Sequence, residues 1–120
     1  SFVRHAFLMK KIILITIMVS TFGVSHAKAY QSSAELLSEC ESEHVFENYG
    51  CLNFIKGVHR ALDGTRWHYP NDVYCAPPSI TNGQLKKIYE KYANNWPEYL
   101  HKDAANEVIV SLRYAFPCPS

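Results

Sequence analysis

The sequence lacks the motifs of the common small enzymes and metal proteins. It contains neither Gly-x-Ser-x-Gly nor His-Glu-x-x-His, and its four cysteines include no Cys-x-x-Cys pair. These absences argue against the corresponding hydrolase and zinc chemistries. A face that binds nucleic acid requires clustered Lys and Arg, and this sequence has no such cluster. We therefore expect a binding protein that is not an enzyme, with no cofactor, no metal and no nucleic-acid partner.

A long apolar run occurs only near the start of the chain. Residues 12–24 are apolar apart from Thr, Ser and Gly, and they follow the basic Met9-Lys10-Lys11. Two possible cleavage sites come next, Ser25-His26-Ala27 and Ala27-Lys28-Ala29. This order is typical of a secretory signal peptide, and the run is shorter than the roughly 20 residues of a membrane span. We expect residues 1–8 to be an over-extended or non-native segment, 9–29 a signal peptide and 30–120 one exported domain.

Cleavage after Ala29 would change the sign of the charge. The remaining residues carry eight Lys and Arg against eleven Asp and Glu, a net charge of −3 instead of the +1 of the whole sequence. All four cysteines, Cys40, Cys51, Cys75 and Cys118, lie in this part. An even number in a small exported domain predicts two disulfides, which compensate for a limited hydrophobic core.

Helical periodicity dominates the remaining sequence. Leu52, Ile55, Val58 and Leu62 predict a central helix from Cys51 to about residue 63, after a turn over 41–49. Gly57 inside it suggests a close helix contact, and Gly64 suits a left-handed conformation after its end. Three further helices are expected at about 34–41, 82–95 and 104–116, and their caps are Ser32 or Ser33, Thr81 with Gln84, and Asp103.

Four helices with short or moderate links predict a small all-α, bundle-like domain. The first helix ends at Cys40 and the second begins at Cys51, while Cys75 precedes the third and Cys118 follows the fourth. Antiparallel neighbours would bring each pair together. Among three possible connectivities we favour Cys40 with Cys51 and Cys75 with Cys118.

Several short motifs resemble one known family in their order along the chain. They are Cys51-x-x-Phe54-Ile55-x-Gly57-Val58, Cys75-x-Pro77, Thr81-x-x-Gln84-Leu85, Trp96-Pro97 and Ala115-Phe116-Pro117-Cys118. In this order they resemble the Rap/Tai family of periplasmic immunity proteins. The resemblance implies a small helical protein of the periplasm, often a homodimer, that obstructs the active site of a peptidoglycan amidase effector of type VI secretion.

Candidate partner-binding residues lie in two connecting segments. Trp and Tyr are frequent energetic anchors of interfaces, and the segment 66–74 contains both. We expect this segment to enter the partner's cleft, helped by the turn that contains Trp96. For Tyr69 and Trp96 the alternative is that they cover the core. The candidates are Arg66, Trp67, His68, Tyr69, Asn71, Asp72, Asn94, Asn95 and Glu98.

Two other functions fit the same sequence. A periplasmic acid-stress chaperone would expose apolar surface when its carboxylates protonate. A small hydrolase or metal-binding domain fits less well, because His59 on the central helix is a better candidate for a hydrogen-bonded residue than for a metal ligand.

Overall fold

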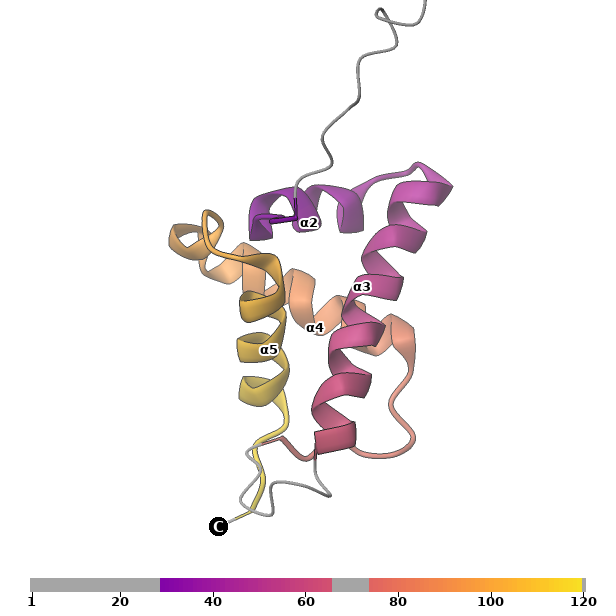
Figure 1. Ribbon diagram of the computed structural model, residues 1–120, viewed down its shortest axis with the longest axis vertical. Helices are drawn as coiled ribbons and strands as arrows, with labels where there is room; N and C mark the ends of the chain where they lie inside the picture. Colours follow the sequence, from indigo (N-terminus) through magenta and orange to yellow (C-terminus); the bar gives the residue numbers. More distant parts are fainter. Residues whose placement is uncertain (1–28, 66–73, 120) are drawn as a thin grey trace, which may run out of the picture.

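The computed structural model describes residues 29–65 and 74–119, and within these ranges the fold is all-α, as predicted. Figure 1 shows α2 beside the start of α3, with α4 passing behind the space between α3 and α5. The predicted signal peptide and the residues before it lie outside the described residues, except for Ala29. The elements are α2 (Ser33–Glu41), α3 (Val45–Gly64), α4 (Asn82–Asn95), η2 (Pro97–Tyr99) and α5 (Ala104–Ala115).

Three of the helices begin at the caps that the sequence predicts. The Ser32 side chain accepts a hydrogen bond from the backbone N–H of Glu35, and the Glu35 carboxylate accepts one from the N–H of Ser32. Thr81 and Gln84 form the same reciprocal pair at the start of α4. At α5 the Asp103 carboxylate accepts from the N–H of Asn106. These bonds satisfy N–H groups that have no partner inside the helix.

The central helix is longer than predicted. It begins at Val45, six residues before Cys51, so of the predicted turn over 41–49 only residues 42–44 connect the helices, and Gly50 lies inside α3. The Asn48 amide donates to the carbonyl oxygens of Cys40 and Ser42, both at 3.2 Å. Together with the Cys40–Cys51 disulfide, these bonds hold the first turns of α3 against the end of α2. Tertiary contacts therefore extend α3 toward its N-terminus into a segment whose local apolar pattern is weak.

Both expectations for glycines in α3 are wrong. Gly57 is exposed, and a Cβ atom there would meet nothing within 4 Å, so it marks no close helix contact. Gly64 is the last residue of the helix, and no glycine in the described part of the chain has a positive φ. The chain leaves α3 through Thr65 in the right-handed region, with its hydroxyl donating to the Leu62 carbonyl at 2.7 Å.

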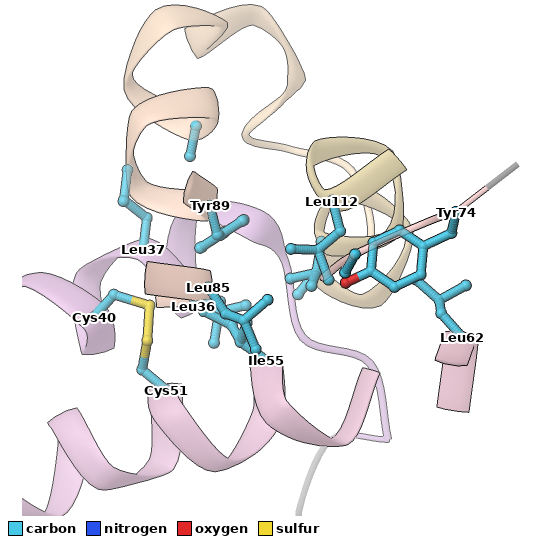
Figure 2. Close-up of a cluster of buried hydrophobic side chains, with 14 residues drawn as sticks. Leu36, Leu37, Cys40, Cys51, Ile55, Leu62, Tyr74, Leu85, Tyr89 and Leu112 are labelled. Atoms are coloured by element: carbon cyan, nitrogen blue, oxygen red, sulfur yellow. A yellow bond between two sulfur atoms is a disulfide. The ribbon is translucent and has the colours of Figure 1, made fainter. Parts of the chain in front are cut away.

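The core lies where one face of each α-helix meets the others. Figure 2 shows Leu36, Ile55, Leu85, Tyr89 and Leu112, which come from α2, α3, α4 and α5 and are at most 1% exposed. Both predicted disulfides are present, Cys40–Cys51 and Cys75–Cys118. The described residues therefore form one buried cluster, with a covalent link at the α2–α3 corner and another between the chain before α4 and the chain after α5.

The start of α2 is attached to the connection before α5. The backbone N–H groups of Ser33 and Ala34 donate to the carbonyls of Lys102 and Leu100, both at 2.8 Å. The N–H of Ala104 donates back to Gln31 at 2.9 Å. These bonds use donors in the first turns of both helices and fix α2 across the end of the bundle.

Candidate protein-binding surfaces

Six of the nine predicted partner-binding residues, Arg66, Trp67, His68, Tyr69, Asn71 and Asp72, lie outside the described residues. The chain on either side of them is well attached. Before them, Thr65 bonds to Leu62 at the end of α3. After them, the N–H of Cys75 donates to the Phe116 carbonyl at 2.9 Å, and the Cys75–Cys118 disulfide follows.

Tyr74, the last residue of the predicted binding segment, belongs to the core. It is 0% exposed, and its hydroxyl lies 2.6 Å from Nδ1 of His59. The two rings meet edge to face, with their centroids 5.7 Å apart. The prediction that the segment contacts a partner up to residue 74 is therefore wrong at Tyr74, and the prediction that His59 is hydrogen-bonded is confirmed. Within residues 29–65 and 74–119, no group of three His, Cys, Asp or Glu residues could hold a metal ion.

The three predicted residues near the end of α4 have different roles. Asn94 donates its side-chain amide to Glu41 Oε1 at 3.0 Å and to the Glu90 carbonyl at 2.9 Å, so it joins the ends of α4 and α2. Asn95 is exposed and lines a groove between α4 and α5. Glu98 is exposed on η2. Asn95 and Glu98 are available to a partner, and Asn94 contributes to the scaffold.

The groove beside Asn95, which we call the α4/α5 groove, is largely aromatic and apolar. It encloses about 220 Å³, and the exposed fractions of Trp96 and Tyr114 are 42% and 78%. The Trp96 ring stacks on Tyr99 at a centroid distance of 6.1 Å, so Trp96 both contacts the scaffold and faces solvent. The groove residues are Ile88, Lys91, Tyr92, Asn95, Trp96, Ser111, Tyr114 and Ala115.

A buried carboxylate, Glu107, binds the hydroxyl of the groove residue Tyr92. Glu107 is 2% exposed and accepts hydrogen bonds from the Tyr92 hydroxyl and the Asn106 amide, both at 3.1 Å. Burial and the Glu107 charge raise the pKa of Tyr92 to about 12. Glu107 is not among the residues predicted from the sequence, although its spacing from Ala104 and Ser111 places it on the buried side of α5.

A second exposed apolar surface lies at the start of α3. Val45, Phe46 and Tyr49 are 64%, 91% and 60% exposed, and the exposed Glu43 and Glu47 lie beside them. We call these five residues the corner surface. The corner surface is not predicted from the sequence, because the segment is expected to be a turn. Positions 45, 46 and 49 share one helix face, but this is visible only once α3 is known to begin at Val45.

A helical, disulfide-linked scaffold with two exposed aromatic surfaces is typical of a small protein-binding module. The comparison with protein families identifies the family: the chain belongs to the Rap1a immunity proteins, whose match covers residues 32–118. The match runs from the cap of α2 to Cys118 and therefore includes every described helix and both disulfides. It confirms the resemblance seen in the sequence. Neither the comparison with curated proteins nor the one with solved structures gave a match.

Family membership supports a role as an immunity protein, which implies a cognate effector as partner. Immunity proteins generally act without catalysis. The two disulfides fit a secreted or periplasmic protein. None of the helices in the described ranges has the length and apolar character of a membrane span.

Proposed function

We propose that this protein is a periplasmic immunity protein that binds a type VI secretion peptidoglycan amidase effector and inhibits it by occluding the active-site cleft. The observation that carries the proposal is the family match over residues 32–118, which spans the whole described fold. In this proposal the protein is not an enzyme and needs no cofactor, because a tight stoichiometric complex is enough to block a cleft.

Segment 66–72 is the part that we propose enters the cleft, with Asn95 and Glu98 contacting the effector nearby. The attachment of both flanks supports this, since a segment fixed at its two ends loses less conformational freedom on binding than a free one. Trp67 and Tyr69 are the proposed anchors, because large aromatic side chains often dominate the energy of an interface.

The proposal also includes the cellular location and the oligomeric state. Residues 9–29 would direct export, and the mature chain would act in the periplasm, where disulfides form. A homodimer is proposed from the family resemblance. Sedimentation of the oxidised mature protein tests the dimer independently of any effector.

The decisive experiment combines the oxidised mature protein with the amidase encoded beside its gene. We expect the two to co-purify and the complex to lose peptidoglycan hydrolysis. Full hydrolysis without a complex would contradict the proposed function. Exposure of apolar surface on acidification would then favour the acid-stress chaperone.

The contact segment has its own test. We expect Trp67→Ala with Tyr69→Ala to weaken inhibition while the unfolding midpoint and helicity stay unchanged. Val110→Ala is the control, because Val110 is an exposed apolar residue on α5 outside the proposed contacts, and inhibition should survive this change. If the double substitution lowers stability and inhibition in parallel, Trp67 and Tyr69 belong to the core.

A further inference from the structure

Phe46 has the highest exposed fraction among the large hydrophobic side chains of the described residues. It is 91% exposed in the first turn of α3, and Val45 and Tyr49 continue the same apolar face at 64% and 60%. A single exposed apolar residue is ordinary, but three on one face of a small domain mark an interaction site.

The corner that carries Phe46 is rigidly supported. The Cys40–Cys51 disulfide links the end of α2 to the second turn of α3. Asn48, between Phe46 and Cys51, donates to both Cys40 and Ser42 and accepts from the Lys86 ammonium at 3.2 Å. Support of this kind reduces the conformational entropy that the corner loses when a partner binds. The corner surface is therefore preorganised for binding.

The sequence on either side of Phe46 is acidic. Residues 30–55 contain five Glu and no Lys or Arg. Glu39 accepts a hydrogen bond from Gln31 and Glu41 accepts one from Asn94, so both have partners within the protein. Glu43 and Glu47, within three residues of Phe46 in the sequence, are both exposed and add negative charge near it. The complement of such a surface is an apolar pocket bordered by Lys or Arg.

We propose that the corner surface is a docking site for the effector, with Phe46 in an apolar pocket whose border is basic. This inference rests on the proposed function, because the occupant is the effector itself. A second copy of the chain fits less well. A symmetric dimer through this surface would place the corner against itself and bring Glu43 and Glu47 close to their own copies, which is repulsive.

The test is calorimetric titration of the effector with the oxidised mature protein and its variants. We expect Phe46→Ala to raise the Kd about thirtyfold or more, as for the central aromatic residue of an interface. Glu43→Lys with Glu47→Lys should also raise the Kd. Glu43→Gln with Glu47→Gln should flatten the salt dependence seen with the unsubstituted protein. Val110→Ala serves as the control and should leave the Kd unchanged.

The outcomes separate this inference from the proposed function. If the unsubstituted protein does not bind the effector, both are wrong. If it binds and inhibits while the Phe46 and Glu43/Glu47 variants keep its Kd, only the docking site is wrong. Loss of a dimer in Phe46→Ala with an unchanged Kd would identify the corner as a self-interface and also overturn the inference. If Phe46→Ala lowers the unfolding midpoint, its Kd is no longer informative. The Kd of Glu43→Lys with Glu47→Lys then decides whether the docking site is correct.

Discussion

Replacing Tyr89 with Phe should remove one of the main polar links between α4 and α2. The Tyr89 hydroxyl is fully buried; it donates to the Ser33 carbonyl at 2.9 Å and lies 2.7 Å from the Ser33 hydroxyl. A hydrogen bond is worth about 1 kcal/mol, and a buried partner left unsatisfied costs about 1–3 kcal/mol. We therefore expect Tyr89→Phe to lower the free energy of unfolding by about 2–3 kcal/mol.

Urea unfolding of the oxidised protein measures this change. Tyr114→Phe is the matched control, because that ring is 78% exposed and its substitution should change the free energy of unfolding by less than about 0.5 kcal/mol. Adding Ser33→Ala to Tyr89→Phe should cost less than the sum of the two single changes, because both remove the same contact. Additive effects would refute the coupling.

The pH dependence of the free energy of unfolding gives a second test of the buried Tyr89 hydroxyl. Burial raises the pKa of Tyr89 from 10.0 to about 12, although its bond to Ser33 acts in the opposite direction. Between these two values the unfolded chain has lost the phenol proton and the folded chain has kept it. The unfolded state then binds fewer protons, so stability falls by about 1.4 kcal/mol for each pH unit in this window and is unaffected by Tyr89 below it. Tyr89→Phe should remove this contribution; an unchanged alkaline slope would refute the reasoning.

Three further experiments test other parts of the scaffold. Glu107→Gln removes a charge that raises the pKa of Tyr92, so the pKa should fall from about 12 toward 10.0 in an ultraviolet titration of the phenols; an unshifted alkaline transition would contradict this. Cys75→Ser with Cys118→Ser opens a link with a sequence separation of 43 and should cost about 4 kcal/mol in urea unfolding. Thr81→Ala removes the cap of α4 and should cost about 1 kcal/mol, whereas Thr81→Ser should cost little.

Local signals were sufficient to predict most of the fold. Ser32, Thr81 and Asp103 are caps whose side chains bond within three residues, so their neighbours in the sequence determine the geometry. The disulfide pairing followed from the order of helices and cysteines. The start of α3 could not be predicted in this way, because Asn48 and the Cys40–Cys51 link hold it through contacts with α2.

The binding surfaces were harder to predict, because exposure depends on where every other element packs. Asn94 has the same side chain as Asn95 and lies next to it, yet Asn94 joins α4 to α2 and Asn95 borders the α4/α5 groove. Phe46 in a segment read as a turn gave no sign that it would face solvent. Tyr74, by contrast, was assigned to a binding segment and is buried.

Each disulfide lies next to a part of the chain that is proposed to recognise the effector. Cys40–Cys51 supports the corner surface, and Cys75–Cys118 fixes the chain directly after residues 66–72 and Tyr74. Cys40 and Cys51 belong to the buried core, together with apolar residues of α2, α3, α4 and α5. A substitution at Phe46 therefore removes almost no buried contact from the fold, because that side chain is 91% exposed. A change at Phe46 should accordingly leave the free energy of unfolding nearly constant.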